Sequence, residues 1–336
     1  MICIIESVKK MTTTHKERML SVDVLKGLLI FSVVLGHCTV GREEFAYSLT
    51  ADICYSFHMF LFIGLSGWLV GKKEKNREWI IRRGKRLMIP YFVWSCFFCI
   101  IKADSIVAFL YKLFFDPYLW YLIVLFLCDL IVCILEKCFR SRNRFIVSGL
   151  GCFLILNILY ITNIISNIET FKMLAIYFIF YFIGYCLHKY EYAVNKRLSL
   201  ICTILYPFSM ILYQYKIHER PSVILSSIGL SDGIIQFLNK TGFVLYNHFV
   251  VAALGCFFFT RAAKVICKRT IYLRNTFSFL AKYTLQIYII SDLVKINFFR
   301  NTLVNVISSL VLGLLVPCAI GYFIHKNRTI EKVLFG

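Results

Sequence analysis

The fold is decided by the stretch at residues 22–40, VDVLKGLLIFSVVLGHCTV, in which 19 consecutive residues carry only Asp23, Lys26 and His37 as ionisable side chains. A helix of this length rises by roughly 28 Å, which matches the ~30 Å hydrocarbon core of a bilayer. A lone strand would leave its backbone groups unpaired in lipid. The stretch therefore predicts a membrane-spanning helix.

Nine further apolar windows of similar length follow, and their continuous runs disfavour a barrel, whose strands alternate apolar and polar residues. The ten windows cover residues 22–40, 53–71, 87–102, 118–136, 144–161, 173–188, 198–215, 242–261, 277–294 and 303–325. We therefore expect an all-α fold, a polytopic integral membrane helix bundle with about ten transmembrane helices. Residues 1–21 would form a cytoplasmic arm, 22–325 the transmembrane domain and 326–336 a cytoplasmic tail.

The composition of the whole chain supports this interpretation. Of the 336 residues, 59% are hydrophobic and 17% charged, and the mean hydropathy is +0.73. Soluble domains carry about 25% charged residues, so too little polar surface is available to cover a water-soluble body of this size. Disorder, collagen and coiled coil are excluded as well, because polar tracts, glycine repeats and charged heptads are missing.

The net charge of +20 raises the question of nucleic acid as a partner, and the placement of the charges answers it. With both termini in the cytoplasm, 27 Lys and Arg residues fall on the cytoplasmic side and 9 on the opposite side. This bias fits the positive-inside rule and attraction to anionic headgroups, so the expected partner is the lipid bilayer and not nucleic acid. No signal peptide precedes the first span, and we expect a multi-pass protein of a bacterial inner membrane.

The fourteen cysteines are scattered, mostly in the apolar windows, where cysteine behaves as a small hydrophobe. Cys96 and Cys99 have the spacing of metal ligands, but no second pair or histidine cluster lies nearby in the sequence, so no metal is expected. Neither an internal repeat nor a nucleotide-binding or hydrolase motif appears. The chemistry must therefore come from polar residues inside the membrane.

Ionisable residues within spans are costly in lipid, which makes each of them a candidate site residue. They are Asp23, Lys26, His37, His58, Asp129, His248, Lys282 and Asp292. Eleven residues separate Lys26 from His37, so the two side chains share one helix face and lie roughly 16 Å apart along the axis. Asp23, three residues before Lys26, can offset its charge.

The second window, 53–71, runs back towards the cytoplasm and places His58 at about the depth of His37, with Ser66 and Gly67 near the depth of Lys26. Two interpretations of the small Ser66–Gly67 pair stay open. It either lets two helices approach closely or lines a narrow passage. His58 is either a ligand-facing residue or a histidine bonded to a neighbouring helix.

The densest basic stretch, at residues 72–91, contains Arg83 and Arg86 at i and i+3 just before the third window. The positive-inside rule explains why the loop is basic, but not this spacing. Paired guanidinium groups at the cytoplasmic mouth of a bundle suit a phosphorylated ligand, because Arg binds phosphate bidentately.

Together these motifs resemble the membrane acyltransferase-3 family, most closely its fucose 4-O-acetylase-like branch. The resemblance rests on Asp23-x-x-Lys26-Gly27 with Gly36-His37, on Phe57-His58-Met59 leading to Ser66-Gly67, on Arg83-x-x-Arg86-Leu87-x-x-Pro90-Tyr91, on Leu119-Trp120-Tyr121-Leu122, and on Thr284-Leu285-Gln-Ile287-Tyr288. The sequence departs from the family pattern at Phe60, where Pro is frequent, and at Ser291, where a His can stand.

The resemblance implies transfer of an acyl group, most often acetyl, from cytosolic acyl-CoA to a hydroxyl of a cell-surface or lipid-linked carbohydrate. His37 would be the catalytic histidine, and Asp23 is the second residue expected in the catalytic set. The cations expected to bind acetyl-CoA or another acyl-CoA are Lys26, Arg83, Arg86, Arg82 and Lys85. The residues expected to line the site of the glycan acceptor are His58, Ser66, Gly67, Trp120, Tyr288 and Asp292.

Depth counting gives one further expectation. His37, His58, His248 and Asp292 all fall near the outer ends of their windows, which predicts an outward-facing polar pocket containing His37 and His58, with Asp292 or Tyr288 as lining. His248 matches no family motif, and independent interfacial side chains are the alternative for His248 and Asp292. A transporter or flippase and a non-catalytic partner in polysaccharide export are the competing functions. The transporter is disfavoured because the sequence shows neither repeats nor broken helices.

Overall fold

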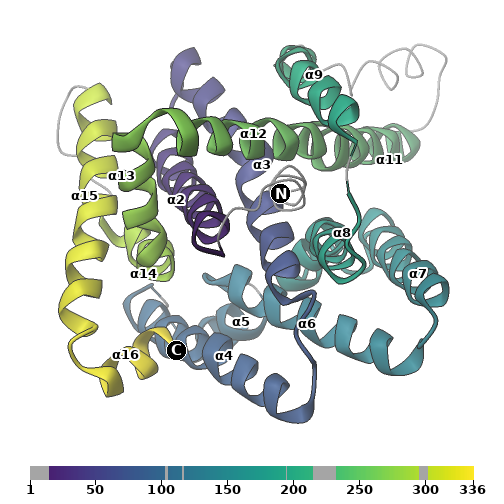
Figure 1. Cartoon of the computed structure of the whole chain (residues 1–336), viewed down its shortest axis with the longest axis horizontal. Helices are drawn as coiled ribbons and strands as arrows, with labels where there is room; N and C mark the ends of the chain where they lie inside the picture. The colour runs from purple at the N-terminus through teal and green to yellow at the C-terminus, as the bar shows by residue number, and fades with distance from the viewer. Residues whose placement is uncertain (1–14, 103–104, 116, 194, 215–231, 295–301) are drawn as a thin grey trace. The chain divides into compact units, whose positions relative to one another are not determined.

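The structure, a computed structural model, describes residues 15–102, 105–115, 117–193, 195–214, 232–294 and 302–336 (Figure 1). All regular elements in these ranges are helical. The chain divides into two compact units, of which the first contains Met1–Phe62, Ala193–Ile217 and Tyr246–Asn327, and the second Ile63–Tyr192, His218–Leu245 and Arg328–Gly336. One division falls inside a single continuous helix, α3, so that its two ends belong to different units.

Unit 1 is built on the first helix. Its elements are α2 (His15–Thr39), the first part of α3 (Phe45–Val70), α9 (Lys196–Gln214), the π-helix η2 (Val244–Val251), α12 (Ala252–Arg269), α13 (Ile271–Lys282), α14 (Thr284–Ile290), the 3-10 helix η3 (Ser291–Val294) and α15 (Thr302–Ile324). Figure 1 shows α13 directly beside α2, and α14 and α15 also pack against α2.

The contact between α2 and α13 depends on Gly27. A Cβ atom at this position would lie 1.8 Å from the carbonyl oxygen of Phe277, so only glycine lets the two backbones come this close. Phe277 also meets Phe31 edge to face, with ring centroids 6.0 Å apart. Small residues at such crossings are the usual means of helix packing in membranes, where burial of apolar surface gives little driving force.

Unit 2 consists of the end of α3 and of α4 (Arg77–Lys102), α5 (Ile106–Phe114), α6 (Trp120–Cys138), α7 (Arg142–Ile161), α8 (Glu169–Lys189), α11 (Asp232–Phe243) and α16 (Arg328–Phe335). Within it α8 packs against both α6 and α7, and α4 against α6. The expected tail at 326–336 contains α16, which packs on α4, where the Trp94 indole donates to the carbonyl of Leu334 at 2.7 Å.

Six helical segments are long and apolar enough to cross a membrane: Leu20–Thr39, Phe45–Val70, Arg142–Ile161, Glu169–Lys189, Gly233–Arg269 and Thr302–Ile324. The prediction of an all-α polytopic membrane bundle is confirmed. Three further windows also lie in helices that are not among the six. They are 87–102 in α4, 118–136 from Trp120 onward in α6, and the described part of 198–215 in α9. The number ten stays a prediction.

The window 277–294 was expected to be one continuous helix, and this expectation is wrong. The structure divides it into the end of α13, α14 and η3, with a break at Tyr283, whose φ of −109° and ψ of 22° leave the helical region. The hydroxyl of Thr284 donates to the carbonyl of Ala281 at 2.8 Å, and a side chain that bonds to the backbone in this way competes with the helical hydrogen bond. The expected absence of broken helices therefore does not hold.

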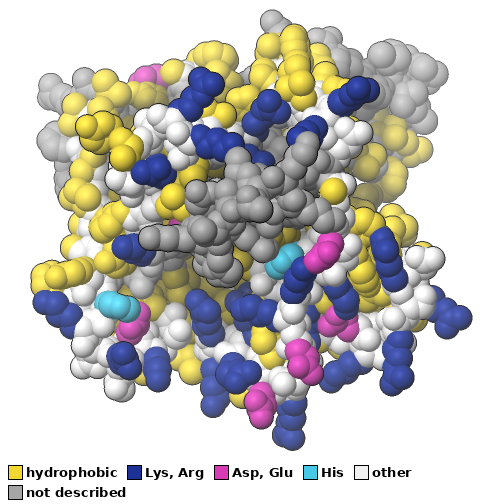
Figure 2. All heavy atoms as spheres, viewed as in Figure 1, with side chains coloured by type: hydrophobic (Ala, Val, Ile, Leu, Met, Phe, Trp, Pro, Cys, Tyr) yellow, Lys and Arg dark blue, Asp and Glu magenta, His cyan; other side chains and the backbone are white. Residues whose placement is uncertain are grey.

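The surface carries the apolar side chains that a lipid environment requires. On α7, α9 and α15 large hydrophobic residues stay exposed, among them Ile155, Phe208 and Leu315, each with about 60% of its surface accessible. Figure 2 shows broad hydrophobic areas with many Lys and Arg side chains among them. In water such exposure would be a liability, whereas in lipid it is the expected state.

The described residues begin at His15, so α2 starts seven residues before the predicted window. Residues 1–14 of the predicted arm lie outside the described residues, as do Tyr215 of the seventh window and four of the cations assigned to the outer side, Lys216, Arg220, Lys295 and Arg300.

Candidate functional site

The two histidines of the first two windows lie close together in unit 1. The ring centroid of Tyr55 lies 6.1 Å from that of His37 and 5.2 Å from that of His58. Because both distances share the Tyr55 ring, the two imidazole centroids are at most 11.3 Å apart, the two distances added. We call His37, Tyr55 and His58 the imidazole cluster. The depth argument requires the two histidines to be close, whereas the outward-facing polar pocket around them stays a prediction.

Glycine at position 36 explains how α2 and α3 meet at this point. A Cβ atom on Gly36 would lie 3.1 Å from the Cβ atom of Cys54 and 3.5 Å from the Tyr55 ring, so the two helices are in close contact one residue before His37. The Gly36-His37 dipeptide thus brings the imidazole against Tyr55. Tyr55, which the sequence argument did not single out, is the residue that joins the two histidines.

The hydrogen bond of His58 fixes which of its nitrogens carries the proton. Its Nδ1 lies 2.5 Å from the carbonyl oxygen of Cys54, one turn earlier in α3. A carbonyl can only accept, so Nδ1 carries the hydrogen and, in the neutral ring, Nε2 keeps a lone pair. His58 is almost fully buried, and its bond runs within its own helix, not to a neighbouring one.

At the other end of α2, the predicted pair of Asp23 and Lys26 has a third member. Both side chains are half-buried, and Asp23 interacts electrostatically with Lys26 and with Lys282 of α13. The sequence indicated Lys282 only as an ionisable residue in a span. Its proximity to Asp23 results from the close packing of α13 on α2.

The remaining outer-end residues of unit 1 occupy separate elements. Tyr288 is half-buried in α14. His248 lies in η2 beside Phe60, with ring centroids 6.0 Å apart. Asp292 belongs to η3, which packs on α2 and α15, but its side chain lies outside the described residues. The family departure Ser291 is buried next to Gly313 of α15.

Unit 2 holds a second polar cluster, centred on a buried carboxylate. The Nε atom of Arg83 donates to Oδ2 of Asp129 at 2.8 Å, and the hydroxyl of Tyr181 donates to Oδ1 of the same carboxylate. Asp129 is 2% exposed and Arg83 18%. We call Arg83, Asp129 and Tyr181 the arginine cluster. The sequence indicated Asp129 only as an ionisable residue in a predicted span, and not that Arg83 is its partner.

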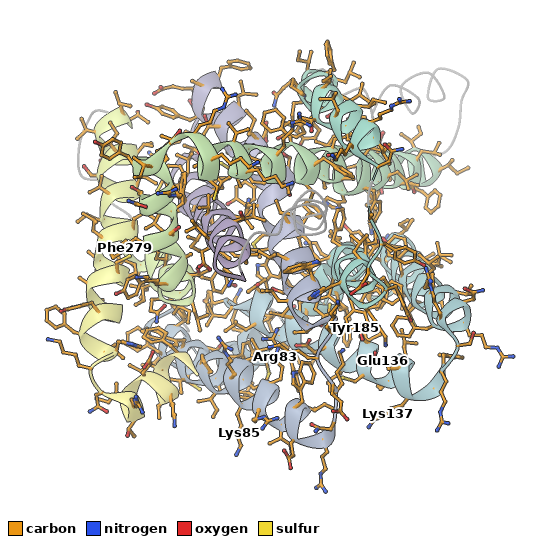
Figure 3. The ribbon with its side chains drawn as sticks, viewed as in Figure 1. Arg83, Lys85, Glu136, Lys137, Tyr185 and Phe279 are labelled. Atoms are coloured by element: carbon orange, nitrogen blue, oxygen red, sulfur yellow. The ribbon has the colours of Figure 1, made fainter. Side chains whose placement is uncertain are left out.

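The other expected cofactor-binding cations of α4 differ from Arg83 in exposure. Arg82, Lys85 and Arg86 are exposed, and Arg86 lies close enough to Arg83 for the two positive charges to repel each other. Figure 3 shows Arg83 on the side of α4 that faces α6, whereas Lys85 extends away from the helices. Asp129 thus pairs with Arg83, and Arg86 adds a second positive charge beside this pair, which leaves a local excess of positive charge among the described residues.

Ser66 and Gly67 also contribute to unit 2. A Cβ atom at Gly67 would lie 2.2 Å from the carbonyl oxygen of Tyr181, so the glycine permits a close approach of α3 and α8. The hydroxyls of Ser66 and Tyr121 lie 3.2 Å apart. Of the two interpretations that the sequence left open, the close helix approach is the one that these distances describe. Trp120 is half-buried, and its ring stacks on Tyr177 with centroids 5.2 Å apart.

A third group of charges in unit 2 surrounds Glu136. This carboxylate accepts from Tyr185 and Lys189 and lies 3.5 Å from the ammonium of Lys75. The Lys75 side chain is only 3% exposed, and its Nζ donates to the Tyr185 hydroxyl at 2.7 Å. Burial lowers the pKa of Lys75, and the carboxylate of Glu136 opposes this shift. Among the described residues no group of three His, Cys, Asp or Glu is arranged to hold a metal ion.

Comparison with known proteins adds the family. Curated proteins and solved structures gave no match. A family model described as an acyltransferase domain, that of the acyltransferase-3 family, matches residues 19–326. This range contains both polar clusters and nearly the whole chain. The chain therefore belongs to the acyltransferase-3 family of membrane acyltransferases.

Proposed function

We propose that the protein is a membrane O-acetyltransferase of the fucose 4-O-acetylase-like branch, which transfers an acetyl group from cytosolic acetyl-CoA to a hydroxyl of a cell-surface or lipid-linked carbohydrate. The observation that carries the proposal is the imidazole cluster, in which His37 and His58 meet around Tyr55 inside a family-matched acyltransferase domain. The proposed location is the inner membrane of a bacterium.

The reaction needs little from the protein beyond positioning and a base. A thioester is already activated, so the enzyme must hold it against the acceptor and remove the proton that the hydroxyl loses. His37 takes this proton as the hydroxyl oxygen attacks the thioester carbonyl carbon. The C–O bond forms, the C–S bond breaks, and the proton on His37 passes to the leaving CoA sulfur. Imidazole suits both steps, because its ordinary titration range lies near neutral pH.

His58 has a different role in this proposal. Its Nδ1 hydrogen is committed to the carbonyl of Cys54, which leaves Nε2 as an acceptor for a second hydroxyl of the sugar. Two imidazoles with complementary tasks, one removing a proton and one orienting the acceptor, explain why both are kept in a span despite their cost. Tyr288 and Asp292 remain proposed lining residues.

Acyl-CoA would bind through its phosphates to cations on the cytoplasmic side. The proposed set is Lys26 at one end of α2, and Arg83 and Arg86 with their neighbours Arg82 and Lys85 on α4. Along α2, which is continuous between Lys26 and His37, the two side chains are separated by about 16 Å. An extended pantetheine arm is of comparable length, so phosphates held near the cytoplasmic face and a thioester at His37 are mutually compatible.

The proposal is tested with membranes that contain the full chain. Radiolabelled acetyl-CoA is added, and the label is measured in the lipid-linked and polymeric glycan fractions. In a second experiment, the masses of these glycans are compared between cells with and without the gene. We expect label in a glycan with the wild type and at least a hundredfold less with His37→Gln. Equal transfer by the two proteins would exclude His37 as the base. A carbohydrate acceptor would be excluded if no glycan differed by the mass of an acetyl group between the two kinds of cell.

One observation favours the competing transporter function. Interrupted helices form the substrate sites of many transporters, and the segment α13–α14–η3 is interrupted at Tyr283. The two functions differ in their need for acyl-CoA. Movement of a labelled lipid-linked sugar across proteoliposomes without acyl-CoA would support transport, whereas acetyl transfer that stops when acyl-CoA is withdrawn supports the enzyme.

A further inference from the structure

Asp129 is a buried charge to which the proposed reaction assigns no task. It lies in the middle of α6, and both of its oxygens are occupied, Oδ2 by Arg83 and Oδ1 by the Tyr181 hydroxyl. A buried carboxylate is costly unless it is paired and hydrogen-bonded, and this one is fully supplied from two other helices, α4 and α8. The residue is therefore held in a single position.

The bond to Asp129 leaves most of the Arg83 guanidinium unused. A guanidinium group has five N–H donors, of which Nε has one and the two terminal nitrogens have four. Within the described part of the chain, the hydrogen bond to Asp129 uses Nε, and the terminal nitrogens neither donate to the protein nor are buried without a partner. Arg83 is thus fixed at Nε, while its terminal nitrogens keep some accessible surface.

The charges around the Arg83 guanidinium favour an anionic ligand. Arg86 lies one turn further along α4, near enough to Arg83 for their charges to interact, and Asp129 supplies the carboxylate that faces Arg83. Two positive charges against one negative charge leave room for an anion. Terminal guanidinium nitrogens match phosphate oxygens in both charge and bidentate geometry.

The surrounding residues stabilise this arrangement. Tyr181 is fixed by the close approach of α8 to Gly67, and Tyr121, which meets Ser66, lies close enough to interact electrostatically with both Arg83 and Asp129. Residues from two of the sequence motifs thus enclose the arginine cluster. Their placement is explained by support of Arg83, without any contact of their own with a ligand.

We infer that Asp129 is a positioning residue which, together with Tyr181, orients Arg83 so that its terminal nitrogens bind a phosphate of acyl-CoA. The inference rests on the proposed function, since it takes acyl-CoA as the ligand. Asp129 touches neither donor nor acceptor and acts only through Arg83. The alternative is an ion pair that merely joins α4 to α6.

The test measures binding of two probes to the purified full chain in detergent. CoA carries the phosphates, whereas pantetheine carries the same thiol arm without the nucleotide. For Asp129→Asn we expect CoA to bind about tenfold more weakly, the lower end of what a hydrogen bond to a charged group contributes, with pantetheine unchanged. In an Arg83→Gln background, Asp129→Asn should have no further effect on CoA binding. Lys137→Ala, an exposed cation at the end of α6, is the matched control.

Kinetics separate a positioning role from a structural one. Asp129→Asn should raise the KM for acyl-CoA and leave kcat at saturating acyl-CoA within about twofold, because only binding is impaired. If the asparagine variant does not fold, Tyr181→Phe removes one bond to the carboxylate and should weaken CoA, but not pantetheine, about threefold.

The possible failures are distinguishable. The positioning role would be overturned if Asp129→Asn bound CoA as the wild type does while Arg83→Gln bound it more weakly. Where Asp129→Asn does not fold, Tyr181→Phe takes its place in this comparison. The proposed phosphate site would stay intact in either case. Equal loss of CoA and pantetheine binding in Asp129→Asn would identify a purely structural ion pair. Unchanged CoA binding in Arg83→Gln would show that the phosphates bind elsewhere, and both the inference and this part of the proposed function would fail.

Discussion

Replacing Gly67 by alanine tests the packing that supports the arginine cluster. The added Cβ atom would lie 2.2 Å from the carbonyl oxygen of Tyr181, and real Cβ contacts stay beyond 3.0 Å, so the backbones of α3 and α8 must separate by roughly 1 Å. Neither atom belongs to a flexible side chain, and the strain cannot be relieved by a rotamer change. Overpacking of this kind costs about 1–3 kcal/mol.

The matched control is Gly151→Ala in α7. No atom lies within 4 Å of a Cβ built on Gly151, so the alanine meets open space. A compatible glycine-to-alanine change stabilises a protein by about 0.4–1 kcal/mol through the unfolded state. The two variants make the same chemical change, and their difference isolates the clash. We therefore expect Gly67→Ala to be less stable than Gly151→Ala by about 1–3 kcal/mol, the cost of the clash, because the gain through the unfolded state is common to both variants.

Thermal unfolding of the two purified variants in the same detergent measures this difference, and the KM for acyl-CoA provides a second readout. Displacement of Tyr181 should loosen the support of Asp129, so Gly67→Ala should also raise the KM while Gly151→Ala does not. If the two variants unfold at the same temperature, the close approach of α3 and α8 is not a feature of the folded protein. The account of Gly67 as a packing residue would then be wrong.

Substitutions at His37, Arg86 and Glu136 give further tests. His37→Gln should lower acyl transfer by about a hundredfold or more at unchanged membrane content, with the exposed His325→Gln near wild type, and equal loss in both would point to a general effect. Arg86→Ala should raise the KM for acyl-CoA with little change in kcat, and an unaltered acyl-CoA titration would contradict this. Glu136→Gln should destabilise the protein by about 3–5 kcal/mol, because it leaves the buried ammonium of Lys75 without its carboxylate. The double variant Glu136→Gln with Lys75→Gln should recover most of this stability. Burial lowers the pKa of Lys75, so the folded state binds fewer protons than the unfolded state and becomes more stable as the pH rises. The melting temperature of Glu136→Gln should therefore rise between pH 7 and pH 10. A melting temperature that does not change over this range would refute the role of Lys75.

The fold class follows from the sequence because the signal is local. A run such as residues 22–40 is too long and too apolar to be anything but a span, and its helix is present as predicted. The break at Tyr283 could not be read in the same way. The hydroxyl of Thr284 bonds to the backbone next to the break, but a threonine at that position is equally compatible with an unbroken helix.

The relations among the site residues could be predicted within one helix, but not between helices. Lys26 and His37 share a helix, so their spacing can be calculated from the sequence alone. Tyr55 belongs to α3 and reaches His37 only because Gly36 lets two helices meet, which is a tertiary effect. The link between Arg83 and Asp129 spans 46 residues and depends on how α4 packs against α6, so it could not be derived from the sequence.

A rule of charge connects what was predicted with what was not. Ionisable residues inside predicted spans are costly in lipid, so the sequence indicates Asp129 as a candidate site residue without naming its partner. The pairing does not by itself make the site structural. Among the described residues, Asp129 pairs with Arg83, and Arg86 beside them adds a positive charge in excess of this pair. An excess of positive charge next to the accessible terminal nitrogens of Arg83 favours binding of an anionic ligand. In unit 1 Asp23 likewise interacts electrostatically with two cations, Lys26 and Lys282, and this makes Lys282→Gln the next variant to compare with Lys26→Gln for its effect on acyl-CoA affinity.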